Sequence, residues 1–282
     1  WYYLRYCDNK NRKGIFDKKK VSYWCPIDQY IGGAEHACMH LIYFRFYTKF
    51  LRDIKMLDFD EPTLNLFNQG MVHGTDGAVM SKSKGNVVDP LDIIGKFGVD
   101  TLRFYLVSNA SADKDFIWSE PSIESSFKFI VKFMNYFDAV KVGKSGKKVE
   151  SKLNKAIKGV SEDIERFKYN LAVIKIRQLF ESLGAEESKN TLESLLKLMH
   201  PFCPHITEEL WEKLGNKTFI SLAKWPAADE KKIDEKYEVI DSMLDTVKAD
   251  VRKVLELTKI DNPNKVTLFV SESWKYGFFG KL

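Results

Sequence analysis

Two lysines two positions apart, Lys82 and Lys84, have the type and spacing that most clearly suggest chemistry. They lie in the polar stretch Met80 to Asn86, here called the serine–lysine loop, where no residue after Met80 is able to pack into a core. This loop offers two ammonium groups, two hydroxyls and several backbone N–H groups to a polyphosphate. An apolar segment, Phe67 to Val72, precedes it, and Asp89-Pro90 opens a helix after it. We interpret the loop as a phosphate-binding candidate held between two packed elements, with a solvated surface loop as the alternative.

A second candidate group, Glu35, His36 and His40, follows the pair Gly32-Gly33. The two histidines are four residues apart, so on a helix they share one face. This spacing is able to hold zinc, but the general base of H-E-x-x-H and a third ligand are missing. Two other interpretations remain: the histidines line a pocket for a small apolar group while Glu35 accepts hydrogen bonds from a ribose, or they are half-buried packing residues.

Composition sets the broad class. The chain has 282 residues, of which 44% are hydrophobic and 29% charged, and two or three domains are expected. Its net charge of +5 is compatible with a nucleic-acid partner. The four cysteines form no C-x-x-C pair, which argues against a structural zinc site or a disulfide framework. No apolar run is long enough to span a membrane and no signal peptide is visible, so we expect a cytoplasmic protein without a membrane partner.

The elements around these candidates read as a parallel α/β unit. Trp1 to Cys7 predicts a buried turn or short helix, and Val21 to Ile31 predicts a strand that ends at Gly32-Gly33. A helix is expected from about Ala34 to Asp53, and the next strand from Asn65 to Val72. Strand, glycine pair and helix together are typical of a turn that a ligand approaches closely.

Beyond the loop the pattern becomes helical. Asp89-Pro90 begins a helix that Gly98 ends, and Asp100 is expected to cap the next one, to about Ser108. From about Ser122 to Trp225 we predict an antiparallel bundle of four or five helices. One helical face within this bundle is expected to carry Phe127, Ile130, Val131, Met134 and Phe137. Asn170 and Asn190 are each expected to cap the start of a helix. The lysine-rich stretch Lys141 to Lys158 is read as a linker followed by a helix start, with a solvated charged face.

The last part of the chain predicts one more unit. Glu235 to Thr258 has the pattern of a long amphipathic helix, and Lys265 to Val270 that of a strand. Trp274 to Leu282 follows soon after. Because one strand cannot close a sheet, we expect only the start of a third domain here.

Several motifs resemble one family, the leucyl-tRNA synthetases, which are class I aminoacyl-tRNA synthetases. Its loop, usually written K-M-S-K-S, is similar to Met80 to Asn86. Gly-Gly-Ala-Glu-His-Ala, residues 32–37, resembles the leucine enzymes in particular. The other similar stretches are Trp1 to Tyr3, Tyr30-Ile31, His40-Leu41, Gln69 to Val72, Asp100 to Arg103 and His200 to Trp211. Asp250 to Lys275 resembles archaeal and eukaryotic-type members more than bacterial ones.

The resemblance implies a fold that is α/β plus all-α. It consists of the C-terminal half of a Rossmann-type parallel α/β catalytic domain (residues 1–120), an antiparallel anticodon-binding-type helix bundle (121–228) and the start of a small α+β C-terminal domain that binds tRNA (229–282). The implied reaction joins leucine to ATP and then passes leucine to tRNA(Leu). ATP with Mg²⁺ is expected as a substrate, not as a prosthetic group, and no protein metal site is expected.

The resemblance also implies roles for single residues. Lys82 and Lys84 are the expected catalytic residues, because they neutralise charge on the departing pyrophosphate. The expected ATP-binding residues are Gly32, Gly33, Glu35, Met71, Val72, Ser81, Lys82 and Ser83. The expected leucine-binding residues are Tyr2, Tyr3, His36 and His40, and the expected tRNA-binding residues are Lys141, Lys144, Lys147 and Lys148.

Two departures from the family pattern matter. Val79 replaces the first lysine of the usual loop, which alters its expected grip on phosphate. The family's first catalytic motif and its editing domain do not occur in these residues, so we expect the chain alone to be inactive and to need an N-terminal catalytic and editing half, in the same chain or a partner chain. The alternatives are a valyl- or isoleucyl-tRNA synthetase, or a non-catalytic tRNA-binding fragment.

Overall fold

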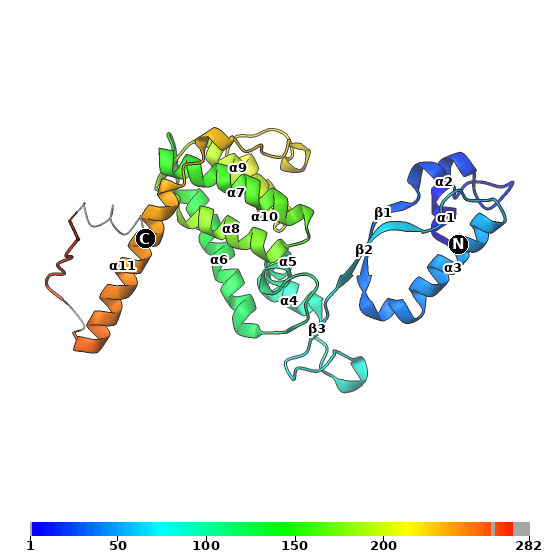
Figure 1. The fold of residues 1–282 in the computed structure, drawn as a ribbon, viewed down its shortest axis with the longest axis horizontal. Helices are drawn as coiled ribbons and strands as arrows, with labels where there is room; N and C mark the ends of the chain where they lie inside the picture. The colour runs from blue at the N-terminus through cyan, green and yellow to red at the C-terminus, as the bar shows by residue number, and fades with distance from the viewer. Residues whose placement is uncertain (1, 261–262, 273–282) are drawn as a thin grey trace. The chain divides into compact units, whose positions relative to one another are not determined.

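The structure, a computed structural model, describes residues 2–260 and 263–272, without the side chains of Tyr2 and Glu238 (Figure 1). The chain divides into two compact units, residues 1–230 and 231–282. The limits predicted between residues 120 and 121 and between 228 and 229 stay predictions. No helix among the described residues is both long and apolar enough to cross a membrane.

The first elements form a small parallel α/β unit. They are α1 (Tyr2–Cys7), α2 (Lys18–Trp24), β1 (Ile27–Gly33), a 3₁₀ turn (Ala34–Cys38), α3 (His40–Asp53) and β2 (Thr63–Gln69). β1 and β2 pair in parallel with α3 as the crossover, as Figure 1 shows. Buried Leu4, Val21 and Leu51 are part of the small core beneath them.

The predicted strand Val21 to Ile31 is wrong in its first part, and the expected turn or short helix at Trp1 to Cys7 is confirmed as α1 for its described residues. Val21 lies in α2, because the carboxylate of Asp17 accepts the N–H groups of Lys19 and Lys20 and caps a helix there. The strand starts only after Pro26.

The next elements surround the serine–lysine loop. They are β3 (Val72–His73), a 3₁₀ turn (Lys82–Lys84), α4 (Pro90–Phe97), α5 (Val99–Asn109) and β4 (Phe116–Ile117), which pairs in parallel with β3. Asp89 caps α4 through the N–H of Leu91, as predicted. Gly98 ends α4 with a φ of 84°, a backbone conformation that glycine adopts without strain.

The prediction that Asp100 caps α5 is wrong. Gly98 is the residue before α5, and Asp100 lies buried inside its first turn. Its carboxylate accepts the backbone N–H of Ile206, 2.7 Å away, and therefore caps another helix 106 residues later in the chain.

Five helices form the bundle: α6 (Glu120–Ala139), α7 (Lys147–Glu165), α8 (Tyr169–Glu181), α9 (Lys189–Met199) and α10 (Pro204–Lys213). The short strands β5 (Lys141–Val142) and β6 (Glu186–Glu187) pair in parallel at one end of the bundle. Of the residues predicted to share one face of this helix, Ile130 and Phe137 are buried in the bundle core. Phe127, Val131 and Met134 are each 38% exposed instead, because α6 buries the neighbouring face that carries Phe129 and Phe133.

Two predicted caps in the bundle are also wrong. Ser188 caps α9 by accepting the N–H of Thr191, so Asn190 lies within the first turn. Lys168 precedes α8, and the side-chain oxygen of Asn170 is buried with no described hydrogen-bond donor. In both helices the capping position lies two residues before the predicted asparagine.

The second unit contains α11 (Lys236–Thr258), which agrees with the helix predicted from Glu235 to Thr258. The strand predicted from Lys265 to Val270 is wrong, because these residues form no strand ladder with any described segment. Trp274 to Leu282 lies outside the described residues.

Candidate active site at the strand ends and the serine–lysine loop

The parallel pairing of β1 and β2 brings two predicted site segments to one edge. Gly32 pairs with Asn68 and Gly33 with Gln69, so both strands end at the same level. The Gly32 to His40 segment leaves from one strand end, and Met71 with Val72 follows the other. Ligands of parallel α/β sheets bind at this carboxyl edge.

Glu35 lies directly over the glycine pair. A methyl group added at Gly33 would lie 2.1 Å from a carboxylate oxygen of Glu35, so glycine leaves the space that this side chain fills. The Glu35 side chain is 58% exposed, and its Oε1 lies 3.7 Å from Nε2 of His36. The exposed carboxylate of Glu35, a hydrogen-bond acceptor, is therefore held beside the backbone of Gly33.

Three of the predicted leucine-binding residues, Tyr3, His36 and His40, belong to a connected set of rings. This set, here called the aromatic cluster, consists of Tyr3, Tyr30, His36, His40 and Phe44. Phe44 is its centre, with ring centroids of Tyr3, Tyr30 and His40 between 4.8 and 5.5 Å away. The hydroxyl of Tyr30 lies 2.5 Å from Nε2 of His40. Tyr2 begins α1, but its side chain lies outside the described residues.

Tyr3 is half-buried. Its hydroxyl lies 2.8 Å from Oγ1 of Thr48, and burial raises its pKa to about 12. Our sequence reasoning missed Tyr30 and Phe44. Their signal was spacing: Phe44 is one helical turn after His40, and Tyr30 is two residues before Gly32, on the same side of the strand.

A short hairpin leads into the serine–lysine loop. His73 and Val79 form an antiparallel bridge, and the N–H of Gly74 donates to the carbonyl of Ala78 at 2.8 Å. Asn86 then closes the loop onto the hairpin: its amide nitrogen donates to the Asp76 carboxylate at 3.1 Å, and its oxygen accepts the N–H of Ser81 at 2.8 Å.

The two lysines sit on a single 3₁₀ turn. The N–H of Lys84 donates to the carbonyl of Ser81, and the hydroxyls of Ser81 and Ser83 lie 2.7 Å apart. Both lysine side chains are exposed, and within the described part of the chain neither forms an ion pair. The N–H of Ala78, the Asn86 amide and, more weakly, the charge of Lys84 hold the pKa of Asp76 below its ordinary value. The turn thus presents two ammonium groups to an anion.

Met71 and Val72 follow the end of β2, and Val72 begins β3. The N–H of Met71 donates to Asp115 at 2.8 Å, and Met71 is 38% exposed while Val72 packs inward. A methyl group at the preceding Gly70 would lie 2.1 Å from the carbonyl oxygen of Lys114, so two backbone segments touch here. None of the contacts described above joins this segment or the serine–lysine loop to the aromatic cluster.

The predicted tRNA-binding lysines lie around the start of α7. Lys141 begins β5, Lys144 lies in the loop after it, and Lys147 and Lys148 form the first turn of the helix. The side chains of Lys141, Lys144 and Lys147 are exposed. Their role in binding tRNA stays a prediction.

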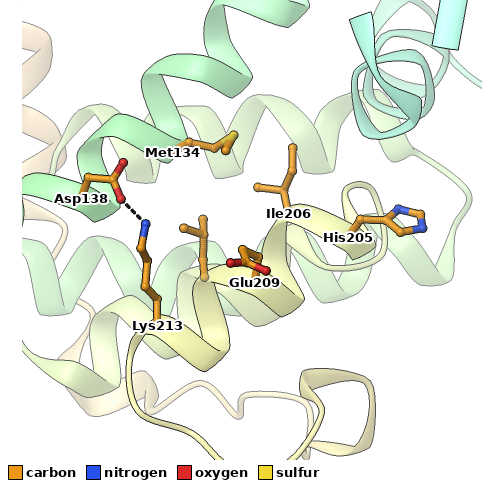
Figure 2. A pocket seen from close by; sticks show the side chains of 7 residues that line it. Met134, Asp138, His205, Ile206, Glu209 and Lys213 are labelled. Atoms are coloured by element: carbon orange, nitrogen blue, oxygen red, sulfur yellow. Dashed lines mark hydrogen bonds and ion pairs between the residues drawn. The ribbon is translucent and has the colours of Figure 1, made fainter. Parts of the chain in front are cut away.

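A separate pocket of about 250 Å³ lies between α6 and α10 (Figure 2). Met134, Ile206 and Leu210 give it an apolar lining, and an ion pair between Lys213 and Asp138 lies at one side. None of the predicted site residues lines it. Among the described residues, no group of three or more His, Cys, Asp or Glu side chains is placed to hold a metal ion.

Family models match most of the chain. One described as "tRNA synthetases class I (I, L, M and V)" matches residues 14–119, which include the strand ends and the serine–lysine loop. Another, described as "Anticodon-binding domain of tRNA ligase", matches residues 146–268.

Similar proteins are bacterial leucine–tRNA ligases. That of Geotalea uraniireducens is 43% identical over 265 residues, which are 85% of this chain and 32% of that protein. That of Clostridium kluyveri is 40% identical over 273 residues, 89% of this chain and 34% of that protein. The chain therefore spans about a third of the length of the curated relatives it matches. The expected likeness of residues 250–275 to archaeal and eukaryotic-type members stays a prediction.

Solved structures agree. The Agrobacterium radiobacter K84 LeuRS in a ternary complex with tRNA and LeuAMS aligns with a TM-score of 0.73 and 32% identity, covering 83% of this chain and 33% of that one. A Mycobacterium tuberculosis methionyl-tRNA synthetase, 16% identical with a TM-score of 0.57 over 77% of this chain and 49% of that one, shares the fold. The predicted fold class is confirmed. The chain belongs to the class I tRNA synthetases, as a C-terminal part of the leucine type.

Proposed function

We propose that this chain supplies the C-terminal part of a leucine–tRNA ligase, which activates leucine with ATP and transfers it to tRNA(Leu). The observation that carries the proposal is the 3₁₀ turn that presents Lys82 and Lys84 without ion-pair partners among the described residues. Two free ammonium groups beside backbone N–H groups form a site for a polyphosphate. The matches to leucine–tRNA ligases support the choice of reaction.

In the first step the leucine carboxylate attacks the α-phosphate of ATP, and pyrophosphate leaves with the electron pair of the broken P–O bond. No covalent enzyme intermediate is needed, so the protein positions the reactants and stabilises charge. Lys82 and Lys84 neutralise the charge that grows on the pyrophosphate. Ser81 and Ser83 offer hydroxyls to the same oxygens, and Mg²⁺ arrives bound to the ATP phosphates as part of the substrate.

The strand ends hold the rest of the nucleotide in this proposal. Gly32 and Gly33 let the ribose and adenine approach the backbone, and the exposed carboxylate of Glu35 accepts a ribose hydroxyl. Met71 and Val72 flank the adenine. The predicted leucine pocket uses Tyr2, Tyr3, His36 and His40, and Tyr30 on β1 holds the His40 ring at the start of α3 through its hydroxyl.

A segment that brings the first catalytic motif is needed, in the same protein or as a partner chain, so the chain alone is expected to be inactive. Cytoplasmic location is proposed on the same basis, since tRNA charging serves protein synthesis. The bundle binds tRNA through backbone phosphates, for which the basic cluster Lys141, Lys144, Lys147 and Lys148 is the candidate contact.

Replacing Lys82 with alanine tests the catalytic proposal. In the intact enzyme, or in this chain combined with its cognate N-terminal half, leucine-dependent pyrophosphate exchange should fall by about 10²-fold or more. Leucine binding should hold, because Lys82 touches only the phosphates. Lys128→Ala, an exposed lysine on α6, is the matched control and should leave exchange unchanged. A wild-type protein that exchanges with none of leucine, valine and isoleucine contradicts the enzyme proposal.

Neutralising three lysines tests the tRNA proposal. In Lys141→Gln/Lys144→Gln/Lys147→Gln, each lost phosphate contact should reduce the salt slope of binding by roughly 0.7 to 0.9. A reduction of about 2 to 3 in the slope of log K against log salt is therefore expected. The control removes three lysines from the N-terminal region, Lys10, Lys13 and Lys19, at equal cost in net charge. Equal effects of the two triple variants would show that only net charge matters.

A further inference from the structure

His73 lies between the hairpin that leads to the serine–lysine loop and the start of β4. It belongs to β3, begins the hairpin that leads to the serine–lysine loop, and is only 19% exposed in its side chain. Its Nδ1 lies 3.1 Å from the carbonyl oxygen of Gly77 at the hairpin tip. Its Nε2 lies 3.2 Å from Oδ2 of Asp115, the residue before β4. One ring therefore connects the hairpin to the neighbouring strand.

Both oxygens that face the ring are hydrogen-bond acceptors. A backbone carbonyl never donates, and the Asp115 carboxylate is held ionised because the N–H of Met71 and then the ring of His73 lower its pKa. A neutral imidazole has one N–H and can serve only one of them. The imidazolium has two N–H groups and serves both.

The hairpin connects the two contacts of His73 to the loop that carries the catalytic lysines. His73 bridges Val79, which is three residues before Lys82, and Asp76 at the hairpin tip binds Asn86 at the far end of the loop. We propose that His73, together with Asp115, is a positioning residue for the serine–lysine loop, and that the doubly protonated ring holds the loop more firmly than the neutral ring. This role in catalysis rests on the proposed function, whereas the tether itself does not.

The charged groups on the elements around His73 are Asp113, Lys114 and Asp115 before β4, Asp76 in the hairpin, and Lys82 and Lys84 in the loop. Hydrogen bonds led by Ser111 for Asp113 and by the Ala78 N–H for Asp76 lower the pKa of both acids. Lysines ordinarily keep their charge up to about pH 10. Between about pH 5.5 and about pH 8, histidine is the side-chain type whose charge ordinarily changes.

Amide hydrogen exchange of this chain tests the tether without any catalytic activity. The amides to follow are those of Gly74, Gly77, Ala78, Ser81 and Lys84, each of which donates a hydrogen bond in the hairpin or loop. After correction for the intrinsic effect of pH, wild-type protection should fall about threefold to tenfold from about pH 5.5 to about pH 8.

Asp115→Asn should reverse this trend. Its amide oxygen still accepts the Met71 N–H, while its NH₂ now faces Nε2 of His73 and donates to the neutral ring. Protection in this variant should therefore be higher at about pH 8 than at about pH 5.5. A substitution that only destabilises the fold does not invert the pH dependence of amide protection. Asp113→Asn and His205→Gln are the controls, and both should follow wild type.

His73→Gln provides the second variant, because one amide nitrogen cannot reproduce both ring contacts. Its loop amides should be weakly protected at both pH values. The inference is overturned if wild type shows no pH trend, or if Asp115→Asn or His73→Gln shows the wild-type trend. In the intact enzyme His73→Gln should lower kcat for pyrophosphate exchange several-fold with little change in KM for leucine. A wild type that shows the pH trend but no exchange refutes the proposed function and leaves the tether standing.

Discussion

Asp100 should be one of the most sensitive positions for the stability of the bundle. Its side chain is 3% exposed, and its carboxylate accepts two hydrogen bonds: from the N–H of Ile206 at 2.7 Å and from Nδ1 of His205 at 2.8 Å. Ile206 is in the first turn of α10, where backbone N–H groups have no partner within the helix. Asp100 on α5 therefore does the work of an N-cap from a distant part of the chain.

The cost of Asp100→Ala follows from these contacts. Losing an N-cap costs about 0.5 to 2 kcal/mol, and leaving a buried N–H without an acceptor costs about 1 to 3 kcal/mol. These two ranges describe largely the same loss and are not summed. The His205 ring is 69% exposed, so its contact adds roughly 0.5 kcal/mol after solvent screening. We expect a loss of about 2 to 3 kcal/mol in the free energy of unfolding.

Urea unfolding followed by tryptophan fluorescence measures this loss, because Trp211 is buried on α10 itself. Asp100→Asn keeps one acceptor oxygen for Ile206 and should recover about half of the loss or more. Glu212→Ala removes an exposed acid from α10 and should cost less than about 0.5 kcal/mol. If Asp100→Ala costs no more than Glu212→Ala, or Asp100→Asn costs as much as Asp100→Ala, the capping explanation is refuted.

Three further changes test other parts of the fold. Gly70→Ala puts a methyl group 2.1 Å from the Lys114 carbonyl and should cost about 1 to 3 kcal/mol in urea unfolding. Gly95→Ala, in open space within α4, should instead stabilise by about 0.5 to 1 kcal/mol. Arg45 lowers the pKa of Glu61 from 4.5 to about 2, so the folded state releases this proton more readily and gains stability above about pH 4.5. The advantage of wild type over Glu61→Gln, at most about 1 kcal/mol for this exposed pair, should vanish as pH falls towards 2 in acid titrations.

Local patterns predicted much of this protein because the relevant physics is local. Asp89-Pro90 has a capping carboxylate and a fixed φ at adjacent positions, and α4 starts there in the structure. After Met80 the serine–lysine loop has no apolar side chain to bury, and Lys82 to Gly85 are exposed in the structure. The same reasoning failed at Val21, where β-branched and aromatic residues suggested a strand but the Asp17 cap produced a helix.

Distant contacts explain the other failures. The type of Asp100 marked it correctly as a cap, but only the packing of α5 against α10 decides which helix it caps. Phe127 and Phe129 are equally apolar, and only their neighbours determine that Phe129 is buried against Phe104 and Phe180. No periodicity within α6 distinguishes these two faces.

For the candidate site, the sequence by itself determined which side chains are available: two lysines on a polar turn, a glycine pair, and an acid with two histidines. Residue type and spacing are enough to identify these side chains, because charge and backbone conformational freedom are properties of single residues. Only the tertiary structure decided that the parallel pairing of β1 and β2 aligns their ends, that Phe44 joins the rings, and that His73 meets Asp115. These contacts join residues up to 42 positions apart, and their formation depends on how the strands pair.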